Sequence, residues 1–340
     1  MTGSPPRAKV LWAFAAVYLI WGSTYLAIRF GIETIPPFLM GAMRYLAAGS
    51  VLFLWRARHG APRPTPAEWR GAAVVGALML VGGNGAVMWA EQYVASGVVA
   101  LIVAIVPLWM VLLDWLWQRN AAPTLRVVTG VLLGFGGIAL LIGPGSLRGG
   151  GIHLGGALAV VLGSLSWAAG SLYSRRVTPA GRPFQAIAMQ MLAGGVGLLL
   201  LGLATGEASR LDWAQVSLRS ALSVLYLAVF GSIIAYSAYV WLLGHVNPAR
   251  VSTYAYVNPI VAVLLGWALA GEALTLRMLL ASAVIVAGVA LITWTPRSPL
   301  ERRAPEASAP LAGGGAPASL GAPGSPPSPT SPHGKMPRSA

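Results

Sequence analysis

The chain has 340 residues, of which 56% are hydrophobic and only 9% are charged. A typical soluble domain has about 25% charged residues, so this chain has too few charges to cover the surface of a soluble globule of its size. Its 23 Lys and Arg residues against 9 Asp and Glu give a formal net charge of +14, and it contains no Cys. The absence of cysteine excludes disulfide bonds, thiolate zinc sites and a cysteine nucleophile.

Ten apolar stretches follow one another along the chain, and each is long enough to cross the ~30 Å hydrocarbon core of a bilayer as a helix. In chain order they are Val10–Gly31, Pro37–Trp55, Gly71–Tyr93, Ala95–Trp117, Leu125–Gly143, Ile152–Ser174, Phe184–Thr205, Leu218–Leu243, Ala249–Ala270 and Leu276–Trp294. Their length and their lack of polar–apolar alternation favour helices over barrel strands. The sequence therefore predicts an all-α polytopic membrane protein with ten transmembrane helices.

The basic residues are distributed unevenly between the segments that connect these stretches. If the N-terminus lies in the cytoplasm, 17 of the 23 Lys and Arg residues fall on the cytoplasmic side and 4 fall on the opposite side. This bias follows the positive-inside rule, and it explains the net charge by topology and by attraction to anionic lipids. A nucleic-acid-binding face would need basic residues on a soluble module, so we expect membrane lipids, and no nucleic acid, as partners.

The sequence contains an internal repeat. Residues 21–54 match the residues 146 positions further on, so that Trp21 pairs with Trp167 and Pro37 with Pro183, and later helices match with a shift of 151 or 152. Each half holds five predicted helices, and because five is odd the second half would be inverted relative to the first. Inverted repeats build many secondary transporters, with the binding site where the halves meet.

The repeat and the composition together divide the chain into segments. We expect residues 1–9 to be a cytoplasmic N-terminus, residues 10–143 the first five-helix repeat, residues 144–151 an outer connecting loop and residues 152–294 the second repeat. Residues 295–340 are mostly Pro, Gly, Ala and Ser, with almost nothing to bury. This composition predicts a disordered cytoplasmic tail.

Several motifs give the chain a resemblance to a known family. They are Trp21-Gly22-Ser23-Thr24-Tyr25, Pro36-Pro37 with Arg44 on the next helix, Trp89-Ala90-Glu91-Gln92, Pro107-Leu108-Trp109 with Asp114-Trp115-Leu116, and Gly271-Glu272 before Leu274-Thr275. Over residues 10–294 the chain resembles the EamA branch of the drug/metabolite transporter superfamily, and within it the YedA-like inner-membrane proteins. One departure is visible, because Arg119-Asn120 stands in the first half where the second half has Gly271-Glu272. This departure puts a coupling role for Glu272 in doubt.

The resemblance carries several implications for architecture and function. It implies ten helices in a bacterial inner (plasma) membrane, and a central cavity lined mainly by helices 1, 3, 4, 6, 8 and 9. It also implies the export of small metabolites or drugs, while saying much less about which solute is moved.

Aromatic and amide side chains predicted to lie inside the bilayer are the candidates for binding a substrate. They are Trp21, Tyr25, Asn84, Trp109, Trp167, Tyr236, Tyr254 and Asn258. Trp21 and Trp167 occupy equivalent places in the two halves, where they could form aromatic walls with indole donors for a ligand. The alternative is helix packing, with each indole bonded to a backbone carbonyl. Asn258 could instead bond the carbonyl that Pro259 leaves without a donor, and the tyrosines could join helices.

Two charged residues are predicted within or near the hydrocarbon. Arg44 would lie about two turns inside the second helix, where an unpaired and dry charge costs several kcal/mol. Glu91 and Glu33 are its candidate partners, so Arg44 is either half of a structural salt bridge or part of a site for an anion or a proton-linked ion pair. Glu91 is the best placed acidic residue for carrying a proton, because a dry carboxylate is easily protonated, although its position at a helix end argues against that role.

Pro107 and Pro259 occupy equivalent places in the two halves. Each would remove one backbone hydrogen bond and bend its helix. The bends are either gating hinges or static features of the fold.

The sequence lacks the motifs of other activities. Lys occurs only at positions 9 and 335, so there is no Gly-Lys-Ser/Thr phosphate loop for ATP. We see no hydrolase motif and no cluster of metal ligands, and so expect no catalytic residue, no metal site and no cofactor. The same absence argues against a membrane-embedded enzyme, and the lack of a soluble domain argues against a receptor.

We therefore predict a secondary active transporter that exports a small amphipathic metabolite or drug by alternating access. Coupling to protons is a further hypothesis. The chain would act as a monomer with internal pseudo-two-fold symmetry. A passive facilitator or channel for small organic solutes is the alternative, because an inverted repeat can also build a pore.

Overall fold

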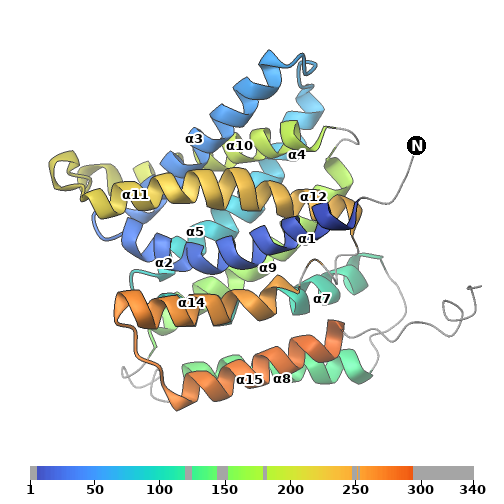
Figure 1. The fold of residues 1–340 in the computed structure, drawn as a ribbon, viewed down its shortest axis with the longest axis vertical. Coiled ribbons are helices and arrows are strands. Elements are labelled where there is room, and N and C mark those ends of the chain that lie inside the picture. The colour runs from blue at the N-terminus through green and yellow to red at the C-terminus, as the bar shows by residue number, and fades with distance from the viewer. Residues whose placement is uncertain are drawn as a thin grey trace, which may run out of the picture. The chain divides into compact units, whose positions relative to one another are not determined.

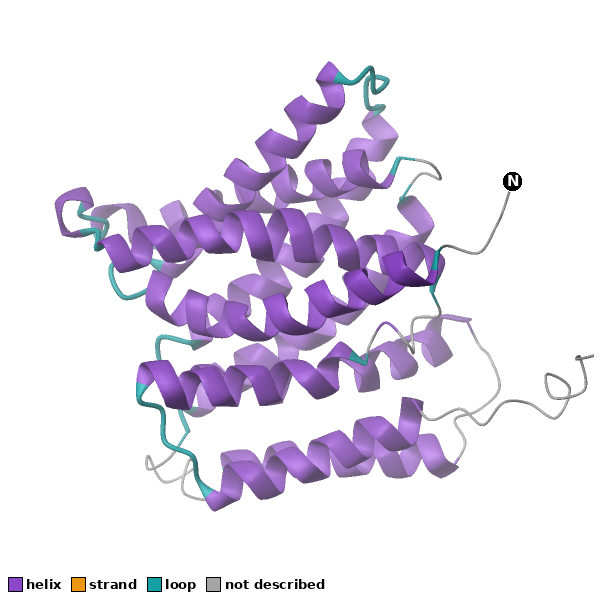
Figure 2. Ribbon diagram, in the orientation of Figure 1, coloured by secondary structure: helices purple, strands orange, loops and turns teal. Residues whose placement is uncertain are grey.

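The computed structural model describes residues 6–118, 125–143, 152–178, 182–246, 251 and 253–293. Every regular element in these ranges is a helix, and the helices are joined by short loops and turns (Figure 2). The prediction of an all-helical protein is confirmed. The connecting loop predicted at 144–151 and the tail predicted at 295–340 lie outside the described residues.

Seven helices are long and apolar enough to cross a membrane. They are Arg7–Gly31, Pro37–Arg58, Pro66–Ala90, Ser96–Trp117, Leu154–Val177, Pro183–Ala204 and Leu218–His245. Three further apolar helices are shorter, at Val128–Ile142, Val257–Ala270 and Leu276–Leu291. The structure thus supports a polytopic membrane protein, while the three short helices leave the full ten-span topology a prediction.

The first half contains helices α1 to α8 (Figure 1). Their bounds are α1 Arg7–Ala15, α2 Trp21–Gly31, α3 Pro37–Arg58, α4 Pro66–Val75, α5 Gly85–Ala90, α6 Ser96–Val103, α7 Val106–Gln118 and α8 Leu125–Ile142. The sequence sets several of these ends. Pro37 begins α3 at a position where a missing N–H costs nothing, and Thr65 and Glu68 form a capping box at the start of α4.

The second half contains helices α9 to α15. Their bounds are α9 Leu154–Val177, α10 Pro183–Ala204, α11 Leu218–Tyr226, α12 Ser237–His245, α14 Tyr254–Ala270 and α15 Leu276–Thr293, with single 3₁₀ turns at Glu207–Ser209 and Trp213–Gln215. Like α3, α10 begins with a proline, Pro183. The two equivalent prolines of the repeat therefore start equivalent helices.

Three of the long helices contain a π-helical segment in their middle. These segments are Ala16–Ile20 between α1 and α2, Gly76–Asn84 between α4 and α5, and Leu227–Tyr236 between α11 and α12. A π-helical turn widens the backbone locally and is frequent at functional sites. Nothing in the apolar pattern of the sequence predicted these segments.

Helices far apart in the sequence pack in pairs. Helix α3 packs against α10, α8 against α15, and α2 against α14, while α9 contacts α5 and the π-helical segment Gly76–Asn84. Figure 1 shows α8 and α15 side by side, with α14 between this pair and α2. The contacts therefore run mainly between the two halves of the chain, so any site at their interface takes side chains from both.

The pairing of α8 with α15 depends on Gly288. A Cβ atom at Gly288 would lie 2.7 Å from the carbonyl oxygen of Gly130 and 2.8 Å from the amide nitrogen of Gly134. Gly288→Ala should therefore push two backbones apart and destabilise the protein by about 1–3 kcal/mol, seen as a lower Tm in detergent. Gly136→Ala is the matched control, because a Cβ there meets no atom within 4 Å. Equal Tm values for the two variants would contradict close packing at Gly288.

Carboxylates from the second half cap helices of the first. The Glu207 carboxylate accepts a hydrogen bond from the Leu39 amide, at 2.9 Å, in the first turn of α3. Burial raises the pKa of Glu207 from its ordinary value, while the α3 amides and Arg210 oppose that shift. The Glu272 carboxylate accepts from the amide and hydroxyl of Ser96, both at 2.7 Å, and from the Gly97 amide at 3.0 Å. Both carboxylates occupy helix N-termini, where negative charge is stabilised.

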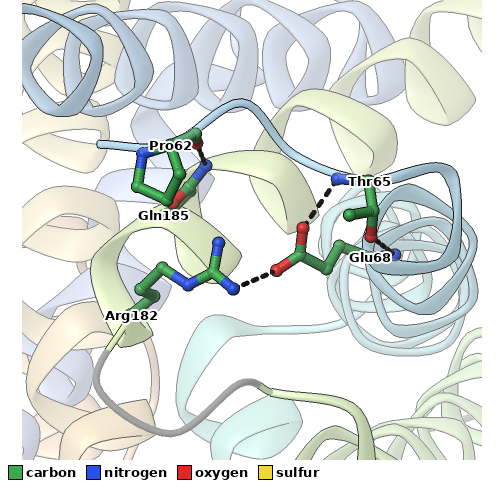
Figure 3. Close-up of polar contacts among 5 residues, drawn as sticks. All are labelled: Pro62, Thr65, Glu68, Arg182 and Gln185. Atoms are coloured by element: carbon green, nitrogen blue, oxygen red, sulfur yellow. Dashed lines mark hydrogen bonds and ion pairs between the residues drawn. The ribbon is translucent and has the colours of Figure 1, made fainter. Parts of the chain in front are cut away.

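An ion pair joins the start of α4 to the residue before α10 (Figure 3). Arg182 lies 3.1 Å from the Glu68 carboxylate, and Gln185 donates a hydrogen bond to the Pro62 carbonyl at 2.8 Å. A second ion pair joins Glu33, just before α3, to Arg219 at the start of α11, at 3.4 Å. Each pair therefore fastens a loop of one half to a helix start of the other.

Candidate functional site

A cavity lies among the helices and takes its wall from both halves of the chain. Its volume is about 60 Å³, enough for a few water molecules but not for an organic solute of drug size. The wall consists of Trp21, Thr24, Tyr25, Ile28, Arg44, Tyr45, Gly83, Asn84, Val87, Val103, Val106, Gly163, Ser164, Trp167, Gly231, Tyr236 and Tyr254. It thus combines aromatic rings, a few hydroxyl and amide groups and one charged side chain.

The two equivalent tryptophans of the repeat meet at this cavity. The ring centroids of Trp21 and Trp167 are 5.6 Å apart, in an edge-to-face arrangement. Tyr254 contacts Trp21 edge-on at 5.4 Å, and Tyr239 packs behind at 4.8 Å from Trp21 and 5.8 Å from Trp167. Such offset pairs are favourable beyond the apolar area that they bury, so this cluster ties α2, α9, α12 and α14 together.

The two indole groups have different hydrogen-bonding states. The Trp21 indole N–H donates to the carbonyl oxygen of Gly231 at 3.2 Å, which matches the packing interpretation of that residue. The buried Trp167 indole nitrogen makes no well-formed hydrogen bond among the described residues, but it interacts with the Tyr239 and Tyr254 hydroxyls. Buried N–H groups are rarely left unpaired. A bound molecule that accepts a hydrogen bond from Trp167 would therefore compete with these two hydroxyls.

Arg44 is buried at the cavity, and no described carboxylate pairs with it. Its side chain is 3% exposed, and its Nε donates to the Ser232 hydroxyl at 2.8 Å. The guanidinium carbon lies 4.7 Å from the centre of the Tyr45 ring, a cation–π contact. The buried Nη1 has no hydrogen-bond partner among the described residues.

The salt bridge expected for Arg44 is wrong for both candidate partners. Glu33 is 39% exposed and pairs with Arg219 instead. Glu91 interacts with the charges of Arg29 and Glu272. Arg44 lies on the face of α3 that contacts the π-helical segment Leu227–Tyr236, so its contacts are a hydroxyl and an aromatic ring rather than a carboxylate.

Glu91 is fully buried directly after α5, next to the cavity wall rather than in it. Both of its carboxylate oxygens are buried without a hydrogen-bond partner among the described residues. Arg29 donates to the backbone carbonyl of Glu91 at 2.7 Å and interacts with its charge, as do Glu272 and the cavity residue Tyr25. Because burial without hydrogen bonds disfavours an ionised carboxylate, this position suits a group that binds and releases a proton.

Four other predicted residues lie on the cavity wall. Tyr25 and Tyr254 are buried in it, and Asn84 is partly exposed at the end of the π-helical segment Gly76–Asn84. The Tyr236 hydroxyl donates to the Gln190 side-chain oxygen at 2.9 Å. Gln190 is the residue of the second half that is equivalent to Arg44. Both residues form hydrogen bonds with the π-helical segment Leu227–Tyr236. Their roles in binding stay predictions.

Two predicted residues are not on the cavity wall. The Trp109 indole donates to the Ser164 hydroxyl at 3.0 Å and packs edge-on against Phe135, so Trp109 holds a wall residue in place from behind. Asn258 is buried in α14, and its side-chain oxygen has no partner among the described residues. The hydrogen bond that we considered between Asn258 and the carbonyl freed by Pro259 would use the amide nitrogen, so the free oxygen does not decide that question.

Pro107 and Pro259, which the repeat makes equivalent, have different local structures. Pro107 is the second residue of α7 and α6 ends at Val103, so the helix is interrupted just before this proline. Pro259 lies inside the continuous helix α14. The helix is therefore interrupted at the proline of the first half, whereas the helix of the second half continues through its proline.

Sequence reasoning missed the small residues of the wall. A Cβ at Gly83 would lie 3.0 Å from the Trp167 ring, so glycine at this position makes room for the indole. Gly163, Ser164 and Gly231 likewise line the cavity. The signal that could have found some of them is their clustering near Trp167 and Asn84 in the sequence, as in Gly82-Gly83-Asn84-Gly85.

Comparisons with known proteins agree with this arrangement. The model of the EamA-like transporter family matches residues 7–143 and again residues 154–294. The uncharacterized inner membrane transporter YedA of Escherichia coli (strain K12) is 44% identical over 283 residues, which cover 83% of this chain and 89% of YedA. The uncharacterized transporter YvbV of Bacillus subtilis (strain 168) is 24% identical, over 84% of this chain and 92% of YvbV.

A crystal structure of another protein shares the fold. Its TM-score is 0.60 at 22% identity, and the match covers 84% of this chain and 96% of that chain. The family model matches once in each half of the chain, on either side of residues 144–153. These similarities identify a membrane transporter rather than an enzyme, and the chain belongs to the EamA-like transporter family.

Proposed function

We propose that this protein is a secondary active transporter that exports a small amphipathic organic solute by alternating access. The observation that carries the proposal is the cavity, which is walled by the aromatic rings of both halves and contains one buried charge. Binding sites of secondary transporters lie where such halves meet. The cavity is too small for a solute as it stands, so binding requires the surrounding helices to move apart.

The pattern of helix contacts supports two inverted repeats of five helices. Each long helix of the first half has an equivalent in the second half, so that α2 corresponds to α9 and α7 corresponds to α14. The contact of α2 with α14 then has its counterpart in the contact of α9 with α7. The pairs α3 with α10 and α8 with α15 are their own counterparts. The ion pairs Glu33–Arg219 and Glu68–Arg182 also join equivalent places. Two similar halves can pack in two near-equivalent ways, one open to each side.

The orientation follows from the charges. We place both termini in the cytoplasm of a cell whose plasma membrane holds the protein, because most basic residues then lie on the cytoplasmic side. Both halves of the repeat, and all of the described residues that line the cavity, belong to one chain. We therefore propose a monomer, driven without ATP and without a cofactor.

Glu91 is the group that we propose to couple transport to protons. Its buried carboxylate oxygens have no hydrogen-bond partner among the described residues, and its charge interacts with Tyr25 of the cavity wall. Loading and release of one proton would change the charge beside Arg29 and Glu272. Such a change can bias two packings of the halves toward one side.

The solute can be found by comparing the medium of cells with and without this chain. Compounds enriched by the wild-type chain would then be tested in proteoliposomes. We expect saturable flux, exchange of labelled against unlabelled solute that is faster than net flux, and acceleration by a proton gradient. Flux that does not saturate and shows no exchange would favour the passive facilitator.

Glu91→Gln separates coupling from transport. We expect this variant to keep solute exchange. The factor by which a proton gradient accelerates its flux should fall about tenfold or more, because the amide cannot take up a proton. Glu33→Gln is the matched control, since Glu33 is 39% exposed in an ion pair with Arg219 and should behave as wild type. A proton gradient that drives the Glu91→Gln variant as well as wild type would contradict the role of Glu91.

A further inference from the structure

We infer that the solute bound in this cavity is a small organic monoanion, a carboxylate joined to an apolar ring-bearing body, and that Arg44 binds its anionic group. This inference rests on the proposed transport function and names the class of solute.

Arg44 has no counter-charge in the part of the chain that the structure describes. It is 3% exposed within α3, and no described carboxylate lies within the 4 Å of a salt bridge. A lone cation at membrane depth is costly. The Ser232 hydroxyl and the Tyr45 ring stabilise the guanidinium in part, but neither neutralises its charge. An anionic ligand would therefore bind favourably by supplying the missing negative charge.

The geometry of the guanidinium suits a carboxylate. Ser232 engages Nε and fixes the plane of the group, while Nη1 has no partner among the described residues. A guanidinium edge with a free donor matches the paired oxygens of a carboxylate. The Arg44 side chain lines the cavity, so a carboxylate that entered the cavity would reach this donor.

The rest of the wall selects against other charges. Among the described residues that line it, Arg44 is the one that carries a charge, and none is acidic. The ammonium group of a zwitterion or an amine would therefore be desolvated beside a fixed cation without a counter-charge, which is costly. Glu91 lies outside the wall, and its charge interacts with those of Arg29 and Glu272.

The aromatic part of the wall determines the other half of the solute. Trp21, Trp167 and Tyr254 present ring faces and edges, and these surfaces gain most from contact with an apolar or aromatic body. The Trp167 indole N–H, which makes no well-formed hydrogen bond among the described residues but interacts with the Tyr239 and Tyr254 hydroxyls, can turn to a ligand acceptor. One anionic end and one ring-bearing end are therefore the combination that the cavity satisfies.

Four compounds with the same phenyl ring and three-carbon chain test this inference. They are 3-phenylpropionate (anion), 3-phenylpropanol (neutral), 3-phenylpropylamine (cation) and phenylalanine (zwitterion). Binding to the purified full-length protein would be measured by tryptophan fluorescence and by the ligand-induced shift in Tm. We expect 3-phenylpropionate to bind at least about tenfold more tightly than each of the others, because charge-assisted hydrogen bonds discriminate by this order.

Variants of Arg44 assign the preference to that side chain. Arg44→Gln should weaken binding of the anion about tenfold or more, down to the level of the alcohol. Arg44→Lys keeps the charge but not the fork and should keep part of the preference, which covers the case that Arg44→Gln does not fold. Arg56→Gln is the matched control, because Arg56 is on the same helix, α3, but does not line the cavity.

The outcomes separate this inference from the proposed function. Equal or tighter binding of the alcohol, the amine or phenylalanine overturns the anion site, and so does the absence of binding by all four compounds at millimolar concentration. Tight binding of 3-phenylpropionate without flux in proteoliposomes overturns transport of this class and leaves the site. Flux of a neutral or cationic compound without binding of the anion leaves transport and overturns the site.

Discussion

Replacing Trp21 with alanine should destabilise the protein by about 3–5 kcal/mol, the usual cost of emptying the site of a buried tryptophan. Trp21 is 8% exposed and contacts Trp167, Tyr239 and Tyr254, which belong to three other helices. Its indole also donates to Gly231 in the π-helical segment Leu227–Tyr236. The expected measurement is a lower Tm in detergent, together with loss of transport, because the wall between the two halves would lose its central ring.

A matched control separates this effect from the general loss of a tryptophan. Trp12 belongs to the same long helix, Arg7–Gly31, but is 77% exposed. Trp12→Ala should therefore change the Tm far less than Trp21→Ala. Trp21→Phe should give an intermediate result, since it keeps a ring but loses the hydrogen bond to Gly231. Similar Tm values for Trp12→Ala and Trp21→Ala would show that the aromatic cluster does not hold the halves together.

The repeat and the composition predicted those features that depend only on where a residue lies along the chain. A shift of 146 residues pairs Trp21 with Trp167, and the structure brings these two rings into contact at 5.6 Å. The apolar stretches predicted the helices, because the length and composition of a membrane helix are fixed by the bilayer. These features need no knowledge of which helix packs against which.

The features that depend on contacts between helices could not be predicted. The ion pair expected for Arg44 was inferred from the predicted positions of Glu33 and Glu91 near the outer side of the membrane. The structure instead gives Arg44 a hydroxyl from the other half of the chain, Ser232, together with the ring of its sequence neighbour Tyr45. The π-helical segments depend on one extra residue in a helical turn, which leaves the apolar pattern of a fully apolar helix unchanged. Trp109 and Asn258 were assigned to the cavity by residue type and depth, and neither property determines which face of a helix is turned inward.

The structure gives a physical explanation for the Gly271-Glu272 motif. Gly271 adopts φ +67° and ends α14 in the left-handed conformation that glycine adopts without strain. The chain turns there, so that Glu272 reaches Ser96 and Gly97 at the start of α6. Helix α14 belongs to the second half and α6 to the first. The motif therefore fastens one half to the other through a helix cap.

Glu272→Ala should accordingly lower stability by about 2–3 kcal/mol. The variant would lose a helix cap, worth about 1–2 kcal/mol, and the favourable interaction of a carboxylate with a helix N-terminus, worth about 1 kcal/mol more. Glu272→Gln should lose roughly half of this, because one amide oxygen can still accept hydrogen bonds from Ser96 while the NH₂ group cannot accept from Gly97. The shift in Tm of the purified protein measures both.

The same pair of variants distinguishes a cap from a proton carrier. Glu33→Ala serves as control, since an exposed ion pair contributes only about 0–1 kcal/mol and Glu33 is 39% exposed. If Glu272 is a cap, Glu272→Gln lowers the Tm but keeps the response of transport to a proton gradient, which Glu91→Gln loses. An unchanged Tm together with a lost response would instead make Glu272 the coupling residue and remove that role from Glu91, its electrostatic neighbour.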